Sequence, residues 1–385
     1  MLYHLTDWLA SLGLDWPGMG LMHYLSFRAM LAAVFSMLIA FLAGGKIIGW
    51  LRKHQIGETI RDLGLEGQMQ KKGTPTMGGI IIIVALLGSA LLVCRLDSIY
   101  TILLMVTTLW CGGIGFADDY IKVFKHNKEG MSEKGKLILQ FGLGLFVALT
   151  VCISPDIPTD QLVTTIPFVK AHEFDYSWLS PFHGQLGVYC SWGIYMVMII
   201  LVILACSNGT NLTDGMDGLA SGTSAIVGVA IGVMAWLSGD VIDAKYLNIM
   251  YIPGAGEVAI FMAAFVGALI GFLWYNTFPA QVFMGDSGSL TIGGIIGVSA
   301  VLIRKELILP LLCGIFLMES LSVIIQRTHF KRTKKKYGEG RRVFLMAPLH
   351  HHYQKKGVPE PRIVTRFWII GIILAVSTLA ILKIR

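Results

Sequence analysis

Long runs of apolar residues constrain this chain more than any other feature of its sequence. Each run is roughly 18 to 25 residues long, the length that an α-helix needs to cross the hydrocarbon part of a bilayer. Only 14% of the residues are charged and the mean hydropathy is +0.68, whereas soluble domains have about 25% charged residues. The sequence therefore predicts an all-α polytopic membrane protein, in which 44 glycines allow helices to pack closely.

The apolar runs predict about ten membrane-spanning helices, with ends placed to within a few residues. No soluble stretch is long enough to form a second domain, so we expect one membrane domain over residues 1–385. The predicted helices cover residues 26–50, 77–95, 98–117, 136–154, 188–206, 217–237, 257–275, 288–303, 307–326 and 366–383.

Lysine and arginine are divided unevenly between the two sides that these helices define. The loops after the odd-numbered helices hold 22 of the 31 basic residues: five in 51–76, five in 118–136 and twelve in 327–366. Because basic loops stay in the cytosol, we expect this side to face inward and both termini to lie outside. The net charge of +7 is then mostly an inner-face property, which suits anionic lipid headgroups and anionic substrates.

Helix counting brings several polar segments to the same inner side. Segments 207–216 and 276–287 contain no Lys or Arg, so only the order of the helices places them. That order collects one set of side chains at a single rim: Asp118, Asp119, Asp214, Asp217, Asp286 and His350 to His352. We therefore expect one site at this rim.

The adjacent carboxylates Asp118 and Asp119 follow the apolar run at 98–117. Charges at membrane depth are costly and usually mark function. Lys122 lies four residues after Asp118 and three after Asp119, so all three can share a helix face. One carboxylate is expected to hold a metal ion or a lysine while the other acts as a base. The alternative is a solvated helix end.

A segment rich in amides and carboxylates follows the helix at 188–206. Its candidate ligands are Asn208, Asn211, Asp214 and Asp217, with glycines between them. Amides can donate and accept at a base or ribose, and carboxylates can bind a metal ion or ribose hydroxyls. The alternative is a polar turn in which Asp214 or Asp217 caps the next helix.

Phe283 and Asp286 lie three residues apart before the helix at 288–303. The aromatic ring could stack a base beside a carboxylate that binds Mg²⁺, which takes oxygen ligands and usually one or two carboxylates with phosphates and water. Asp286 also fits an N-cap of the following helix. The two roles are compatible.

Lys71, Lys72 and Thr76 precede a Gly-Gly pair at the start of a helix. Lysines beside a glycine turn and a helix N-terminus can hold phosphate. The segment lacks the GxxxxGK[ST] pattern, so it is not a P-loop. The alternative for either lysine is anchoring at the inner membrane surface.

His350, His351 and His352 are consecutive, which is the wrong spacing for a shared ion on a helix. We expect imidazoles beside phosphates rather than a zinc site, and the alternative is a basic surface run. Glu319 lies inside the apolar run at 307–326. It is either functional or a buried hydrogen-bonding group between helices.

The chain resembles the phospho-N-acetylmuramoyl-pentapeptide transferase family, the polyprenyl-phosphate sugar-1-phosphate transferases of bacterial cell-wall synthesis. The resemblance covers nearly the whole length and rests on five motifs: KKGTPTMGG at 71–79, GFADDYIK at 115–122, NLTDGMDGLA at 211–220, FMGDSGSL at 283–290 and APLHHHYQKKG at 347–357. It implies transfer of phospho-MurNAc-pentapeptide from UDP-MurNAc-pentapeptide to undecaprenyl phosphate, giving lipid I and UMP with Mg²⁺ at the cytosolic face of the bacterial inner membrane.

The resemblance also assigns roles. Asp286 would hold Mg²⁺, and Asp118 and Asp119 would handle the lipid phosphate and its proton. The nucleotide would meet Asn208, Asn211 and Asp214, with Phe283 near uracil. The phosphates would meet Lys71, Lys72, Lys122 and Lys134, and the sugar-phosphate side would meet His350, His351 and His352.

Two other functions are compatible with the sequence. One is a polyprenyl-phosphate transferase that uses UDP-GlcNAc. The other is a secondary transporter for a nucleotide or anion, although transporters place their sites near the bilayer midplane and these carboxylates gather at one rim. The lipid bilayer is an expected partner, a homodimer is one expected assembly, and no nucleic-acid partner is expected.

Overall fold

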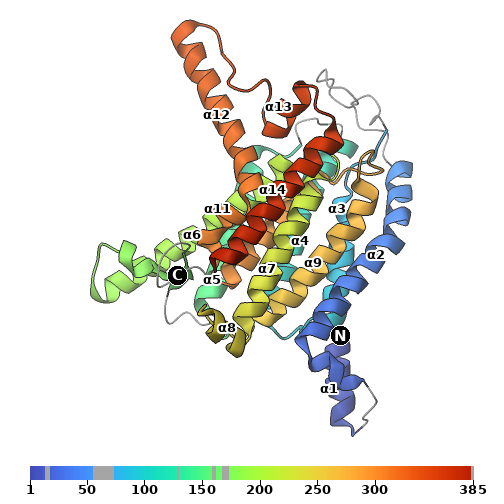
Figure 1. Ribbon diagram of the computed structural model, residues 1–385, viewed down its shortest axis with the longest axis vertical. Coiled ribbons are helices and arrows are strands. Elements are labelled where there is room, and N and C mark those ends of the chain that lie inside the picture. Colours follow the sequence, from blue (N-terminus) through green and yellow to red (C-terminus); the bar gives the residue numbers. More distant parts are fainter. Residues whose placement is uncertain are drawn as a thin grey trace.

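Helices form almost all of the regular structure in the computed structural model of the chain (Figure 1). The structure describes residues 1–13, 18–54, 73–125, 127, 130–157, 162–166 and 173–382. Its elements are α1 (Leu2–Ser11), η1 (Met19–His23), α2 (Leu25–His54), α3 (Gly79–Val93), α4 (Ile99–Phe124), α5 (Glu133–Ile153), β1 (Val163–Thr165), β2 (Glu173–Asp175), η3 (Tyr176–Leu179), α6 (Gly184–Thr213), α7 (Leu219–Gly239), α8 (Val241–Leu247), α9 (Ala255–Asn276), α10 (Gly285–Leu302), η4 (Glu306–Ile308), α11 (Leu309–Leu312), α12 (Gly314–Tyr337), α13 (Leu349–Lys355) and α14 (Glu360–Ile381).

The predicted membrane-spanning class is confirmed. Within the described part of the chain, eight helices are long and apolar enough to cross a bilayer, and a bent pair of helices makes nine. The remaining predicted span is the apolar helix α3, which has 15 residues. Several helices extend beyond their predicted inner ends because polar residues continue the last turns: α4 reaches Phe124 and α6 reaches Thr213.

The prediction of one straight helix over residues 307–326 is wrong. Two pieces, Glu306–Leu312 and Gly314–Tyr337, meet at an angle of 78°. Pro310 lies in the first turn of α11, where its missing N–H costs least, and the chain turns at Cys313. As a result α12 projects away from the bundle at the end opposite α1 and α8 (Figure 1).

Helix α10 is the buried centre of the bundle. All its residues from Ser287 to Leu302 are buried, and it packs against α4, α6 and α3. Small residues make this possible: a Cβ at Gly79 would lie 2.1 Å from the backbone nitrogen of Gly288, and one at Gly115 would lie 2.2 Å from the carbonyl oxygen of Asp286. Close approach of backbones is typical of membrane helix pairs.

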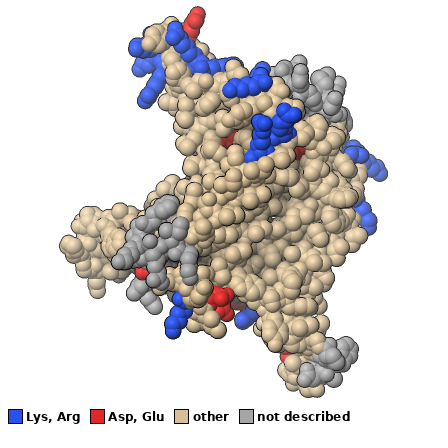
Figure 2. All heavy atoms as spheres, in the orientation of Figure 1, with Lys and Arg blue, Asp and Glu red and all other residues tan. Residues whose placement is uncertain are grey.

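Basic side chains gather mostly at the end of the molecule that carries α12 and α13 (Figure 2). At the opposite end, the two-stranded antiparallel sheet of β1 and β2 covers buried charges. The Tyr176 hydroxyl donates to Glu306 Oε1 at 3.0 Å, and the backbone N–H of Thr165 donates to the carbonyl oxygen of Arg304 at 3.0 Å. The assignment of these two ends to the cytosol and the outside stays a prediction.

A buried ion pair joins α2 to α9. Arg28 Nη1 and Nη2 donate to the two carboxylate oxygens of Glu257 at 2.7 Å each, and both side chains are almost fully buried. The backbone N–H of Arg95 donates to the same carboxylate at 3.0 Å, and the Tyr3 ring covers the Arg28 guanidinium at 4.7 Å. This pair ties α1, α2, the end of α3 and α9 together.

We expect Arg28→Leu to lower the free energy of unfolding by about 3–5 kcal/mol, because it leaves the Glu257 carboxylate buried without a counter-charge. Unfolding in detergent micelles, followed by thermal or SDS titration, measures the change. Arg95→Leu is the matched control: its partner Asp97 is 52% exposed, so we expect a loss of at most about 1 kcal/mol. Equal losses in the two variants would contradict the assignment.

Candidate functional site

Asp118 and Asp119 lie on the last turns of α4, beyond its predicted end, and they point to different neighbours. Lys122 Nζ lies 2.5 Å from Asp118 Oδ2 and 3.4 Å from Asp286 Oδ2. Of the three side chains that their spacing allows on one helix face, Lys122 and Asp118 therefore meet. Asp119 instead points to the start of α10.

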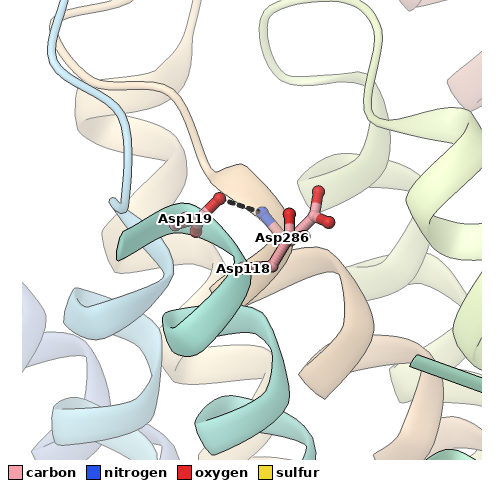
Figure 3. A group of neighbouring side chains, drawn as sticks. All are labelled: Asp118, Asp119 and Asp286. Atoms are coloured by element: carbon pink, nitrogen blue, oxygen red, sulfur yellow. Dashed lines mark hydrogen bonds between the residues drawn. The ribbon is translucent and has the colours of Figure 1, made fainter. Parts of the chain in front are cut away.

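Asp119 caps the N-terminus of α10 from a different helix. Its Oδ1 accepts the backbone N–H of Asp286 at 3.1 Å (Figure 3), and its Oδ2 accepts that of Ser287 at 3.0 Å. Gly285 permits this approach: its φ is +73°, and a Cβ there would lie 2.6 Å from Asp119 Oδ2. The N-cap alternative for Asp286 is wrong, since Asp286 lies in the first turn and Met284 is the N-cap residue.

Lys136 is a site residue that the sequence analysis missed. Its Nζ lies 2.5 Å from Asp286 Oδ2 and 2.9 Å from Asp118 Oδ1. Lys134, which the resemblance named, is exposed on α5 two residues earlier. The sequence did contain a signal for Lys136. Ser132 caps α5, and Lys136 lies four residues before Gln140, a polar residue in the following apolar run, so the two share one face of the helix.

Three carboxylates therefore meet at the ends of α4 and α10 (Figure 3). One oxygen from each of Asp118, Asp119 and Asp286 lies within 4.8 Å of the others. The Asp118 side chain is fully buried, whereas that of Asp286 is 15% exposed. Like charges this close repel, and the ammonium groups of Lys122 and Lys136 offset only two of the three. The arrangement could hold a metal ion.

Asn211 joins this cluster from α6. Its Nδ2 donates to Asp286 Oδ1 at 3.0 Å and to Ser289 Oγ at 2.9 Å. Asn208 lies one turn earlier and faces α5, where its Nδ2 donates to Gln140 Oε1 at 2.9 Å. Both asparagines are on the helix rather than in a loop, because α6 continues to Thr213.

Asp214 and Asp217 have separate positions. Asp214 is the C-terminal cap residue of α6. Asp217 is buried, and its Oδ2 accepts the backbone N–H of Ala280 at 3.1 Å. The N-cap alternative is wrong for both, because Gly218 is the N-cap residue of α7. Asp217 thus supports the segment that leads to Phe283.

Asn276 supports the same segment and was not predicted. Its Oδ1 accepts the backbone N–H of Gly218 at 3.0 Å, and its Nδ2 donates to the carbonyl oxygen of Val282 at 3.0 Å. Its position directly after the predicted helix at 257–275 was the only signal in the sequence. The contacts join the start of α7 to the residue before Phe283.

The described part of the motif at 71–79 braces the segment before α10. The backbone N–H groups of Gly78 and Gly79 donate to the carbonyl oxygens of Phe283 and Met284 at 2.8 Å each, and Phe283 N–H donates to Pro75 at 2.8 Å. Thr76 is buried beside Gly285, while Phe283 is half-buried. Lys71 and Lys72 lie outside the described residues.

The three histidines face different neighbours, as their spacing on a helix predicts. His350 is fully buried; its Nδ1 lies 3.2 Å from Glu319 Oε2, and a Cβ on Gly215 would lie 2.1 Å from its Nε2. His351 Nδ1 pairs with Gln354 at 3.1 Å. His352 Nδ1 accepts the N–H of Leu345 at 3.1 Å, and partial burial together with the charge of Lys356 lowers the pKa of His352.

Glu319 anchors the histidine helix. Its carboxylate accepts the backbone N–H groups of Leu349 at 2.6 Å and His350 at 3.2 Å. The alternative of a buried hydrogen-bonding acid is therefore confirmed. This contact fixes α13 against α12 and places the His350 ring directly against Gly215.

Comparisons with known proteins identify the family of the chain. Residues 101–304 match Glycosyl transferase family 4, and residues 71–83 match the phospho-N-acetylmuramoyl-pentapeptide-transferase signature 1. The chain is 53% identical to the phospho-N-acetylmuramoyl-pentapeptide-transferase of Parabacteroides distasonis, 52% to that of Flavobacterium psychrophilum and 50% to that of Porphyromonas gingivalis. Each comparison covers 100% of both chains. The chain therefore belongs to the phospho-N-acetylmuramoyl-pentapeptide transferase family.

Proposed function

We propose that the chain transfers phospho-MurNAc-pentapeptide from UDP-MurNAc-pentapeptide to undecaprenyl phosphate, giving lipid I and UMP. Full-length relatives that are named for this transfer support the proposal. The observation that carries it is the cluster of Asp118, Asp119 and Asp286 with two lysines. A lipid phosphate oxygen forms a bond to the β-phosphorus of the nucleotide sugar, while the bond from that phosphorus to the bridging oxygen breaks and UMP leaves.

The location of the cluster suits a lipid acceptor. A lipid phosphate lies at headgroup level while its tail stays in the bilayer, and a nucleotide sugar arrives from water. The carboxylates lie at the ends of α4 and α10 rather than at their middles, whereas a transporter site lies near the midplane. We place this end at the cytosolic face of the bacterial inner membrane, because basic residues gather there.

The donor set fits a divalent cation that prefers oxygen. All three candidate ligands are carboxylates with oxygens within 4.8 Å of one another, and Mg²⁺ usually takes one or two carboxylates together with substrate phosphates. We assign Asp286 as the magnesium ligand, because its side chain is 15% exposed and that of Asp118 is fully buried. Bound Mg²⁺ would neutralise charge on the two phosphates.

The remaining side chains divide into ligands and supports. Lys122 and Lys136 lie beside Asp286 and would bind phosphate, together with Lys71 and Lys72. Phe283 would stack on uracil, and Asp214 would meet the nucleotide. His351 and His352 would face the sugar phosphate. The contacts of Thr76, Asn208, Asp217 and His350 fit support of this site.

Asp118 and Asp119 have different expected roles. Both oxygens of Asp119 accept backbone N–H groups of α10, so this residue holds Asp286 in place. Asp118 lies beside both lysines, where a phosphate would bind. We therefore assign Asp118 as the acceptor of the proton when the lipid phosphate arrives as a monoanion.

Purified protein with both substrates and Mg²⁺ should release UMP in step with lipid I, and EDTA should stop the release until Mg²⁺ is restored. Chromatography of nucleotides and lipid extracts measures both products. UDP-GlcNAc is the control donor and should give far less UMP. Transport of the nucleotide sugar into vesicles without UMP release would contradict the proposal, and a phospho-enzyme formed with the nucleotide sugar alone would contradict direct attack.

Asp286→Asn should raise the Mg²⁺ concentration that gives half-maximal rate by roughly 10- to 100-fold or more, because loss of even an outer partner of a metal ligand costs that much affinity. Initial rates over a Mg²⁺ titration measure the shift. Asp97→Asn, an exposed carboxylate on the loop before α4, is the control and should leave the titration unchanged. An unchanged titration for Asp286→Asn would remove the metal assignment.

Asp119→Asn should lower the free energy of unfolding by about 1–3 kcal/mol, because an amide leaves one backbone N–H of α10 facing a nitrogen instead of an acceptor. Asp118→Asn should lower kcat more than Asp119→Asn does, because Asp118 lies beside both lysines, where a phosphate would bind. Unfolding in micelles and kcat of both variants provide the comparison. A larger loss of kcat in Asp119→Asn than in Asp118→Asn would show that the two roles are exchanged.

A further inference from the structure

Helix α5 carries Lys136 into the site although most of its surface is open to lipid. Its buried residues follow one face and are Gln140, Leu143, Gly144, Val147, Ala148 and Val151. This face lies against α6, and a Cβ on Gly144 would lie 3.1 Å from the Cα of Ile200. Apolar packing alone fixes such a helix weakly, because lipid tails are as apolar as the side chains that they replace.

Gln140 is the one side chain on this buried face that can make directional hydrogen bonds. It is fully buried. Its Nε2 donates to Ser207 Oγ at 3.0 Å, and its Oε1 accepts from Asn208 Nδ2 at 2.9 Å. Ser207 Oγ in turn donates to the carbonyl oxygen of Leu290 at 3.2 Å. The Gln140 amide therefore links α5 to α6 directly and to α10 through Ser207.

The Gln140 network lies one helical turn from the carboxylate cluster on all three helices. Gln140 follows Lys136 by four residues on α5, and Leu290 follows Asp286 by four on α10. On α6, Asn208 precedes Asn211 by three. Residues three or four apart share a helix face. The network thus fixes the same faces that carry Lys136, Asp286 and Asn211 into contact.

We infer that Gln140 is a positioning residue, which sets the rotation and height of α5 so that Lys136 reaches Asp118 and Asp286. The inference rests on the proposed function, in which Lys136 meets phosphate at this cluster. Rotation of α5 about its axis would move Lys136 Nζ away from both carboxylates. Gln140 itself is buried below the cluster, so it acts through Lys136 and not on the substrate.

The test is a double-mutant cycle on the transfer reaction, with the variants Gln140→Leu, Lys136→Gln and their combination. We expect Gln140→Leu to lower kcat about tenfold while KM changes less than twofold, because small displacements of a positioned group cost rate more than binding. In the Lys136→Gln background, Gln140→Leu should change kcat less than twofold, because two residues that act as one unit are not additive.

Two further variants keep the test sound. Thr150→Val is the matched control on α5: its hydroxyl donates within the helix to Phe146 at 2.9 Å, and kcat should stay at the wild-type value. Gln140→Asn keeps an amide that is too short to make both bonds, and it replaces Gln140→Leu in the cycle if that variant lacks a cooperative unfolding transition in micelles.

The possible results separate the inference from the proposed function. If wild-type protein releases no UMP, the proposed function is wrong and the inference falls with it. If wild-type protein is active but the two single losses multiply in the double variant, Gln140 acts only on the stability of the fold and the inference is wrong. Wild-type kcat in Gln140→Leu, or in Lys136→Gln, would overturn it as well.

Discussion

The capping of α10 by Asp119 is the contact on which the rest of the site depends. A helix N-terminus leaves backbone N–H groups without partners inside the helix, and at membrane depth such groups are costly. Asp119 satisfies two of them from α4, and its charge also matches the positive end of the helix dipole. The same contact places Asp286, in the first turn of α10, beside Asp118. One carboxylate therefore supports the position of another.

Irregular backbone around this cap is held by paired polar contacts from four directions. The 75–79 segment pairs with Phe283 and Met284, and Asn276 and Asp217 bind the chain between α9 and α10. Glu319 holds α13, which presses His350 onto Gly215. Several polar residues in the motifs thus make contacts that support the site. Backbone N–H and C=O groups at membrane depth have little water to hydrogen-bond. Irregular backbone at such a site therefore needs side chains and neighbouring backbone as hydrogen-bond partners.

Charge balance explains why lysines from two helices enter the cluster. Lys122 and Lys136 contact Asp118 and Asp286, and three carboxylates with two ammonium groups leave one negative charge. Like charges this close repel one another, so a further cation at the three carboxylates of the cluster would lower that repulsion. Phosphates that arrive with a divalent ion would meet the lysines, while the ion would meet the carboxylates.

The sequence by itself determined the membrane class, the positions of most of the spanning helices and the grouping of polar segments at one rim. These follow from the length of the apolar runs and from the order of the helices, and both can be read directly along the sequence. It also predicted that Lys122 can share a helix face with the two aspartates before it, because residues three or four apart share a face of any helix.

Only the tertiary structure decided which neighbour each polar side chain meets. It directed Asp119 to the start of α10, brought Lys136 to Asp118 and Asp286, bent the chain at Cys313 and placed His350 beside Glu319. Each choice depends on the rotation of one helix against another. That rotation is set by contacts between distant residues, such as Gly79 against Gly288, and no local pattern in the sequence encodes it.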